Sequence, residues 1–441
     1  MNLSPFYLGD WQVSPLSNSI QHAGKNKQLE PKAMDVLIYL CSKKGELVSS
    51  DELLNHCWKN IEVGDNPLHK TITQLRKALG DKASAPQYIE TIRKRGYRII
   101  AKLDFPLSEE APKVTSWQGG SPFLGLSAYN TTDNHLFFGR NQAITTLLER
   151  VASQVNFGRA FCLILGPSGT GKSSLVNAGI LPKLLDKRGY NGIGVVSYTQ
   201  LDFADIDHSR LYLDLASAML DWDINNLPVF DGLSAETLAQ QLTQNTNNVI
   251  HTLTNALTKT VTTLKNPKLF LFIDRLEVLL SSPLFDNETR SQFLSVIERL
   301  ATSKAVIVFS ACRNDFYPLV VEQPSLMAGK AHGAHYDLTP PNRHELQQII
   351  RMPAITANLS FSQDPHTKTP LDEILCADTA NNPDALPMLQ YTLQELYLQR
   401  SGNNELLHSI YTKLGGIEGA IGKKAEDVFI ALSNEQQQQL K

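Results

Sequence analysis

The eight residues from Gly166 to Ser173 constrain the fold of this 441-residue chain more than any other segment. Their sequence, GPSGTGKS, follows the apolar run 161–165 and precedes a helix-like segment, 175–185. A strand, a G-x-x-x-x-G-K-S turn and a helix in this order form a phosphate-binding loop. Its glycines let backbone N–H groups turn inward around a phosphate. The pattern predicts an α/β domain that binds a nucleoside triphosphate.

The side chains of this loop have predicted roles of their own. Lys172 would place a positive charge at the β- and γ-phosphates, and Ser173 would offer its hydroxyl to Mg²⁺. We therefore expect ATP or ADP, together with Mg²⁺, as cofactors. The other predicted nucleotide contacts in the loop are Gly166, Pro167, Ser168, Gly169, Thr170, Gly171 and Ser174.

Two further strand patterns supply candidate partners for the loop. The apolar run 269–273 ends in Asp274, the arrangement of a Walker B acid that holds Mg²⁺ through water. Glu277 follows three residues later and could polarise an attacking water. The run 305–309 leads to Arg313, which would sense the γ-phosphate, although an arginine past a strand is also often structural. Strands alternating with helices predict a parallel sheet with the ligand at its carboxyl edge.

The charge of the chain is unevenly distributed. Residues 1–103 contain 15 Lys and Arg against 10 Asp and Glu, a net charge of +5. The remainder contains 26 against 34, a net charge of −8. A basic front part on an acidic body favours a polyanionic partner for the front part alone.

Cysteine usage and hydropathy favour the cytoplasm. The five cysteines are scattered and never in C-x-x-C spacing, which argues against a disulfide or zinc framework. No signal peptide opens the chain, and no apolar stretch approaches the ~18 residues that a membrane helix needs. We expect a cytoplasmic protein with no membrane partner.

The front part reads as short strands, three helices and a terminal hairpin over 88–100. Pro67 and Gly80 mark the start and the end of the third helix. Apolar residues share one face of this helix, namely Leu68, Ile72, Leu75 and Leu79. The opposite face carries Lys70, Thr73, Gln74 and Lys77, with His69 and Arg76 on its flank. A face of donors and small hydroxyls suits the DNA major groove.

This part resembles the OmpR/PhoB-type winged helix-turn-helix over nearly its whole length. The resemblance rests on LEPK at 29–32, GELVS at 45–49, LRKALG at 75–80 and IETIRKRGYR at 89–98. It implies that the third helix enters the major groove while the hairpin, or wing, reaches a neighbouring minor groove. It adds Thr71, Thr73, Gln74 and Arg76 as helix contacts, and Arg93, Arg95 and Tyr97 as wing candidates, although the tyrosine could equally belong to the core. The predicted DNA-binding set is Lys70, Thr71, Thr73, Gln74, Arg76, Lys77, Arg93, Lys94, Arg95 and Tyr97.

The second part resembles the STAND class of signal-transduction NTPases, specifically its "novel STAND" bacterial branch. The resemblance spans about 121 to 430 and rests on SPFLGL at 121–126, FFGR at 137–140, GPSGTGKSSLVNAG at 166–179, RNDFY at 313–317, ALPMLQY at 385–391 and YTKLGGI at 411–417. It implies that Pro387 contacts the adenine and that Gly139 and Arg140 border the nucleotide. This branch tends to carry a pair of acids after the Walker B aspartate, but the second position here is Val278. Either Glu277 suffices, or hydrolysis is slow and the site works mainly as a nucleotide-held latch.

These patterns predict an α/β multidomain chain. We expect a winged helix over 1–104, a linker over 105–120, a P-loop NTPase with a parallel sheet over 121–320 and a helical lid or arm over 321–441. STAND proteins usually continue into a repeat array that senses a ligand, and no such period is visible here. We therefore expect a truncated chain or a short natural variant that lacks its C-terminal sensor.

The combination favours an ATP-dependent transcriptional regulator. Response regulators of the OmpR/PhoB type usually place a receiver domain before the winged helix, and this chain begins at the DNA-binding domain, so the switch must lie elsewhere. The expected partners are double-stranded DNA, further copies of the chain when ATP binds, RNA polymerase and a signal ligand of unknown identity. Two alternatives remain open: a defence or stress ATPase that uses the winged helix for docking, and a housekeeping ATP-driven motor on DNA.

Overall fold

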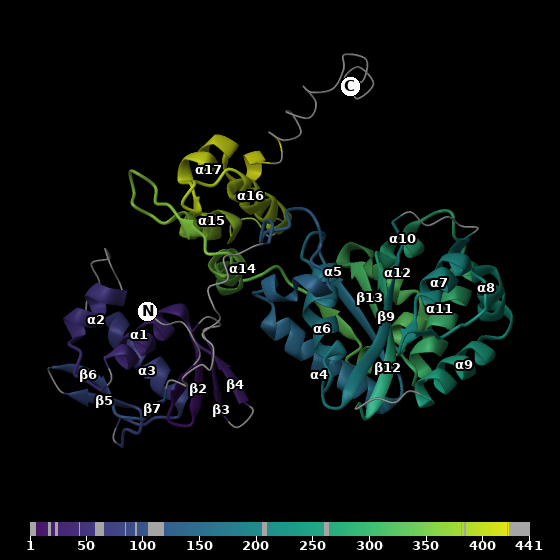
Figure 1. Cartoon of the computed structure of the whole chain (residues 1–441), viewed down its shortest axis with the longest axis horizontal. Coiled ribbons are helices and arrows are strands. Elements are labelled where there is room, and N and C mark those ends of the chain that lie inside the picture. Colours follow the sequence, from purple (N-terminus) through teal and green to yellow (C-terminus); the bar gives the residue numbers. More distant parts are fainter. Residues whose placement is uncertain are drawn as a thin grey trace, which may run out of the picture. The chain divides into compact units, whose positions relative to one another are not determined.

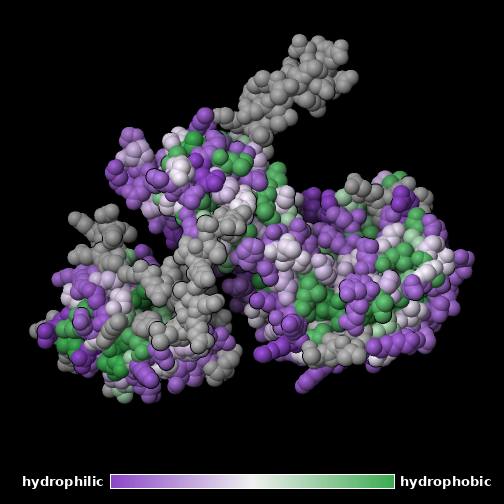
Figure 2. Space-filling model, viewed as in Figure 1, coloured by the Kyte–Doolittle hydropathy of each residue, from purple (hydrophilic) through white to green (hydrophobic). Residues whose placement is uncertain are grey.

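The computed structural model describes residues 6–15, 19–22, 25–43, 45–57, 66–83, 85–92, 95–104, 119–204, 210–259, 264–380, 382, 385–420 and 422. The chain divides into two compact units, Met1–Gln118 and Gly119–Lys441, each of which is described by itself (Figure 1). Polar residues dominate the displayed faces of both units, with apolar residues in small groups between them (Figure 2).

The first unit is a winged helix. Its antiparallel sheet has the order β4-β3-β2-β1-β7 and consists of β1 (Phe6–Leu8), β2 (Trp11–Ser14), β3 (Ser19–His22), β4 (Lys25–Gln28) and β7 (Leu103–Asp104). Three helices follow the first four strands, namely α1 (Pro31–Ser42), α2 (Ser50–Cys57) and α3 (Asn66–Leu79). The antiparallel wing pairs β5 (Ile89–Ile92) with β6 (Gly96–Ile99).

The core face of α3 is the one that the sequence predicts. Leu68, Ile72, Leu75 and Leu79 are all at most 3 % exposed. They pack with side chains of α1, the sheet and the wing in a single apolar cluster. Burial of this stripe leaves the other face of α3 for a partner.

The second unit is built on a five-stranded parallel sheet in the order β14-β8-β13-β12-β9. Its strands are β8 (Phe161–Gly166), β9 (Ile193–Asp202), β12 (Asn266–Asp274), β13 (Val306–Arg313) and β14 (His335–Asp337). The three strands expected from apolar runs are present as β8, β12 and β13. The sequence pattern did not indicate β9, whose carboxyl half alternates buried and exposed residues, or β14, which has only three residues.

Helices cover both faces of this sheet. Along β8, Phe161, Leu163 and Leu165 enter one apolar cluster, while Cys162 and Ile164 enter a second cluster on the other face. Figure 1 shows α4 (Asn141–Phe157) and α6 (Leu181–Leu185) on one side of the sheet. The other side carries α7 (Leu211–Leu220), α8 (Ala235–Gln244), α9 (Thr246–Thr258) and α11 (Asn287–Thr302). Burial on both faces explains why these strands read as continuous apolar runs.

Shorter elements complete the unit. A short helical run leads from the phosphate loop into α6, namely α5 (Lys172–Ser174) followed by a π-helical turn, Leu175–Ile180. A hairpin of β10 (Asp223–Ile224) and β11 (Leu227–Pro228) follows α7. Three further short helices belong to this unit, namely α10 (Leu276–Ser281), α12 (Tyr317–Val321) and α13 (Pro324–Met327).

A helical subdomain, which we call the lid, follows the sheet. It contains α14 (Arg343–Thr356), α15 (Leu371–Ala380), α16 (Leu386–Leu398) and α17 (His408–Leu414), with a strand pair, β15 (Ser360–Phe361) and β16 (Glu405–Leu406). The expected boundary at residue 320 differs from this arrangement, because α12 runs across it and β14 still belongs to the sheet. The sheet domain therefore ends after Asp337.

All five cysteines are buried and free. Within the described ranges, no group of His, Cys, Asp and Glu is arranged to hold a metal ion. None of the helices in those ranges combines the length and the apolar character needed to cross a bilayer.

Gly96→Ala should destabilise the winged helix strongly. Gly96 has a φ of +137°, and an added Cβ would lie 1.9 Å from the carbonyl oxygen of Val48. We expect a loss of about 3 kcal/mol or more in the free energy of unfolding, measured in the calorimetric transition of the first unit. Gly80→Ala is the matched control, since Gly80 also has a positive φ but open space around it, and it should cost about 1 kcal/mol. Equal losses for the two variants would contradict this explanation.

Candidate nucleotide site and nucleic-acid interface

The phosphate loop connects the carboxyl end of β8 to the start of α5. Gly169 and Gly171 have φ values of +76° and +85°, which L side chains rarely adopt. A Cβ on Gly169 would lie 2.6 Å from Cγ of Pro387, at the start of α16. The loop is therefore closely packed against the lid, and glycine makes that approach possible.

Lys172 lies inside the curve of the loop. Its Nζ donates to the carbonyl oxygens of Gly166 at 2.9 Å and Pro167 at 2.8 Å. Burial lowers the pKa of Lys172, while the nearby carboxylates of Glu277 and Asp274 act in the opposite direction. The ammonium is thus held beside the glycine turn, where a phosphate would meet it.

Asp274 ends β12 directly beside the loop. Its Oδ2 accepts from the Ser173 hydroxyl at 2.5 Å, and its Oδ1 accepts from the backbone N–H of Arg275 at 2.9 Å. Burial raises the pKa of this carboxyl, and the two hydrogen bonds oppose that effect. A hydroxyl and a carboxylate are oxygen ligands that Mg²⁺ prefers, so this pair fits the predicted metal site.

Glu277 and Arg313 lie on the same side of the pocket. Glu277, in the first turn of α10, accepts from the backbone N–H of Arg313 at 3.1 Å. The Arg313 guanidinium forms an ion pair with Asp315 and lies 5.5 Å from the ring centroid of Phe316. These contacts place both predicted side chains at the carboxyl edge of the sheet.

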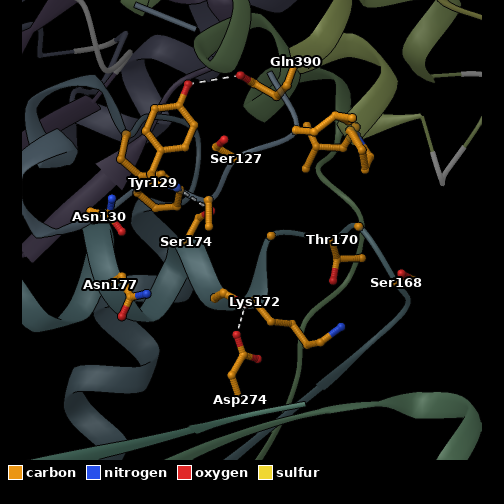
Figure 3. A pocket seen from close by; sticks show the side chains of 18 of the residues that line it. Ser127, Tyr129, Asn130, Ser168, Thr170, Lys172, Ser174, Asn177, Asp274 and Gln390 are labelled. Carbon is orange, nitrogen blue, oxygen red and sulfur yellow. Dashed lines mark hydrogen bonds between the residues drawn. The ribbon is translucent and has the colours of Figure 1, made fainter. Parts of the chain in front are cut away.

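One cavity of about 540 Å³ brings most of the predicted residues together. The four candidate catalytic residues, Lys172, Asp274, Glu277 and Arg313, all line it, as do most of the loop and the lid residue Pro387. Figure 3 shows Lys172 and Asp274 among the lining side chains. Of the predicted nucleotide contacts, Gly139, Gly166 and Pro167 do not line this cavity. Gly139 instead packs on α14, because a Cβ there would lie 2.5 Å from the carbonyl oxygen of Glu345.

Arg140 is buried and engaged with the backbone. Its guanidinium donates to the carbonyl oxygens of Thr170 at 2.9 Å and Thr339 at 3.0 Å, and it lies 3.9 Å from the Glu345 carboxylate. Burial lowers the pKa of Arg140, and Glu345 partly compensates. The resemblance implied that Arg140 borders the nucleotide; its hydrogen bonds hold the phosphate loop against the segment that leads into the lid.

Several residues of the cavity were absent from the sequence predictions. Tyr129 donates from its hydroxyl to Gln390 Oε1 at 3.1 Å, and its backbone N–H donates to Ser174 Oγ at 3.1 Å. Figure 3 shows Tyr129 and Gln390 pointing toward one another at the end of the pocket away from Asp274. Other members of this group are Asn130, Asn177, Gln200, Asp202 and Arg275. Helical spacing from Ser173 could have indicated Asn177, but no local signal identifies the others.

Part of the predicted DNA-binding face is exposed. Lys70, Thr73 and Lys77 are exposed on α3, as is Arg95 beside the wing. Gln74 is half-buried, and its amide donates to Glu30 Oε1 at 3.1 Å. The two other wing positions in the prediction, Arg93 and Lys94, lie outside the described residues.

Three predicted DNA contacts are used within the domain. Thr71 does not belong to the exposed face: it is only 6 % exposed, and its hydroxyl donates to the carbonyl oxygen of Pro67 at 2.8 Å. Tyr97 is 3 % exposed and belongs to the core, which settles the alternative left open by the sequence. Arg76 is half-buried and donates to Ile89 O at 2.8 Å and Thr91 Oγ1 at 2.9 Å, so it ties α3 to the wing.

Comparison with known proteins agrees with the division of the chain into two units. Residues 122–441 match the family model "Novel STAND NTPase 1", and residues 24–99 match "Transcriptional regulatory protein, C terminal". Both resemblances inferred from the sequence are therefore confirmed.

The following relatives and solved structure match the first unit. The transcriptional activator CadC of Escherichia coli is 34 % identical over 108 residues, which are 24 % of this chain and 21 % of CadC. The cholera toxin transcriptional activator of Vibrio cholerae is 33 % identical over 95 residues, 20 % of this chain and 32 % of that protein. The solved DNA-binding domain of E. coli CadC is 33 % identical, with a TM-score of 0.22, and the match covers 23 % of this chain and 95 % of that domain. The chain thus spans about a fifth to a third of these two activators.

Lys172→Ala should weaken nucleotide binding. Removing the ammonium beside the loop removes a charge-assisted contact, so we expect a loss of at least about tenfold in affinity for a fluorescent ATP derivative. Lys183→Ala removes an exposed lysine of α6 and should bind as the unaltered chain does. Unchanged affinity in Lys172→Ala would show that the loop does not hold phosphates in this way.

Asp274→Asn should abolish Mg²⁺ binding without lowering the stability of the fold. A raised pKa in the folded protein means that ionising this carboxyl at neutral pH costs folding free energy. The neutral variant should therefore match or slightly exceed the unaltered chain in melting temperature without added nucleotide. The additional shift in melting temperature that Mg²⁺ gives with ATP should disappear in Asp274→Asn. It should persist in Asp231→Asn, which changes an exposed aspartate.

Proposed function

The chain belongs to the novel STAND NTPase 1 family, and from this premise we propose that it is a transcriptional regulator switched by nucleotide. The first unit would bind double-stranded DNA, and the second would bind ATP or ADP with Mg²⁺. The named relatives of the first unit are transcriptional activators, which supports the DNA-binding half of the proposal. We keep the cytoplasm as the expected location.

The close packing of the phosphate loop on the lid carries the nucleotide half of the proposal. Gly169 and Pro387 approach so closely that no side chain fits between them. Gln390, on the same lid helix, bonds to Tyr129 across the pocket. A ligand in this cavity would touch the sheet domain and the lid at once. Its identity could therefore favour one lid position over another, which is what a two-state switch requires.

The residues present fit a magnesium nucleotide. When bound, ATP would supply the γ-phosphate that distinguishes it from ADP. Lys172 and the loop N–H groups would hold the phosphates, and Ser173 with Asp274 would hold the metal. Arg313 lies at the carboxyl edge of the same sheet, where its guanidinium would exchange Asp315 for a phosphate. These groups would convert the difference of one phosphate into a difference in free energy between two conformations.

Hydrolysis is a slower, separate step in this proposal. Glu277 is the carboxylate that would orient an attacking water, and it already accepts the N–H of Arg313. The position one residue on, Val278, supplies no second acid. We therefore infer that bound nucleotide sets the state of the protein and that hydrolysis resets it.

Self-association would link the nucleotide to the DNA. If ATP favours assembly, several winged helices would reach neighbouring DNA sites together, and the second contact would form at a high effective concentration. This gain needs no new protein–DNA contact. RNA polymerase and a signal ligand remain further predicted partners.

Nucleotide-dependent capture of DNA tests the proposal. The full chain, with ADP or with a non-hydrolysable ATP analogue, would be mixed with random-sequence duplexes at near-physiological salt, and the bound fragments sequenced. The enriched fragments should then bind at least about tenfold more tightly with the ATP analogue, a free-energy difference of about 1.4 kcal/mol. Mass photometry of the same mixtures would report assembly.

The variants separate the two halves of the proposal. Lys172→Ala should bind the enriched fragments equally with either nucleotide, while Lys183→Ala should retain the difference. Sequence-blind capture that collapses with salt and ignores nucleotide would indicate only attraction to phosphates and would refute the proposed regulator.

A further inference from the structure

A hydrogen bond joins α3, the helix predicted to enter the DNA major groove, to the wing. The hydroxyl of Tyr97, in β6, lies 2.7 Å from Nδ1 of His69, in the first half of α3. Tyr97 is 3 % exposed, whereas His69 is exposed. The two rings meet edge to face, with centroids 6.3 Å apart and planes at 73°. A buried hydroxyl thus determines the orientation of a surface imidazole.

The position of Tyr97 is itself fixed by the backbone. Its N–H donates to the carbonyl oxygen of Val48, and the Val48 N–H donates back to the Tyr97 carbonyl oxygen, both at 2.9 Å. The adjacent Gly96 lies against the same Val48 carbonyl, where no Cβ would fit. Because the tyrosine cannot shift without breaking these contacts, its hydroxyl is a fixed point for the His69 ring.

The chemistry of the pair determines which nitrogen carries the proton. A phenol is a stronger acid than a neutral imidazole N–H, and an imidazole nitrogen is a better acceptor than a phenol oxygen. The Tyr97 hydroxyl therefore donates to Nδ1, and the proton of the neutral ring resides on Nε2. The two ring nitrogens diverge, so Nε2–H points away from Tyr97. Among the described residues, Nε2 of His69 has no hydrogen-bond partner.

Two neighbouring polar side chains on this face already make hydrogen bonds within the domain. The Thr73 hydroxyl, one turn along α3, donates to the carbonyl oxygen of His69 at 2.8 Å. An N–H of the Gln74 amide donates to Glu30 at 3.1 Å. Lys70 and Lys77 are exposed but flexible cations. The His69 ring therefore offers an oriented N–H donor at the exposed surface of α3, and within the part of the chain that the structure describes this donor has no acceptor.

We infer that His69 contacts DNA and that Tyr97 is its positioning residue. The Nε2–H would donate to an acceptor of the duplex, either the N7/O6 edge of a guanine or a phosphate oxygen. This inference rests on the proposed function, since it requires that α3 binds DNA. Tyr97, which the family pattern offered as a direct DNA contact, would instead affect DNA binding only by orienting His69.

A double-mutant cycle on the full chain tests the pair. Binding to the DNA enriched by the unaltered chain would be measured by fluorescence anisotropy for His69→Ala, Tyr97→Phe and the double variant. His69→Ala should weaken binding roughly fivefold and Tyr97→Phe roughly threefold, as expected for one oriented hydrogen bond. The double variant should bind no more weakly than His69→Ala, because the tyrosine acts only through the histidine.

Matched controls remove general effects of the substitutions. His22→Ala deletes an exposed imidazole elsewhere in the winged helix, and Tyr39→Phe deletes a hydroxyl bonded to Glu52. Both should bind DNA normally. Nitrogen-15 spectra of histidine-labelled chain should show the His69 signals with Nδ1 unprotonated, and a mixture of tautomers in Tyr97→Phe. That readout detects orientation of the ring even where stability is unchanged.

The two possible acceptors give different results. A base-edge contact would make the loss in His69→Ala specific to the enriched sequence and sensitive to one base pair of it. A phosphate contact would give the same fold loss on unrelated duplexes.

Lys77→Ala distinguishes failure of this inference from failure of the proposed function. If Lys77→Ala weakens binding while His69→Ala and Tyr97→Phe do not, α3 binds DNA but the inferred role of His69 is wrong. Additive losses from His69→Ala and Tyr97→Phe would also refute the pairing. If the unaltered chain selects no DNA sequence, the proposed function itself fails.

Discussion

A single buried guanidinium holds the phosphate loop in its place. Arg140 donates to Thr170 of the loop and to Thr339, just beyond the edge strand β14, and it lies close to Glu345 in the first turn of the lid. A buried charge is tolerated only where such partners compensate its loss of water. Because these partners come from three separate segments, the loop, the sheet edge and the lid are each positioned by reference to one side chain.

Small residues complete this junction. Gly139, directly before Arg140, lies against the backbone of α14, and Gly169 lies against Pro387 of α16. Both have positive φ, so any other residue would bring both steric overlap and backbone strain. At these two points the backbone of Gly139 and of Gly169 comes too close to the lid for any side chain to lie between them. The cavity that remains is bounded by groups from both sides, with the predicted phosphate ligands at one end and the Tyr129–Gln390 hydrogen bond at the other.

The sequence predicted the features that depend on local pattern. Glycine spacing identified the loop, an apolar run ending in an acid identified Asp274, and helical spacing identified the buried face of α3. Features that depend on distant partners were not accessible in this way. Thr71 was predicted as a DNA contact from its position in a family pattern, but it is buried and bonds to Pro67 within its own helix. For Tyr97 the family pattern left a DNA contact and a core position open, and its core position depends on partners such as Val48 and His69 elsewhere in the domain. The roles of Arg140 and Tyr129 likewise depend on contacts far away in the chain, which no local period encodes.

The order of the central sheet has a consequence for synthesis of the protein. Strand β8, which carries the phosphate loop, pairs only with β13 and β14, and both follow it after most of the sheet domain. The winged helix, by contrast, closes its sheet with β7 before the second unit begins. Long-range parallel pairing is slow, and domains generally fold in the order in which they leave the ribosome. A nascent chain that stops before Val306 would therefore carry a finished winged helix and an incomplete NTPase sheet, in which β8 has neither of its partner strands.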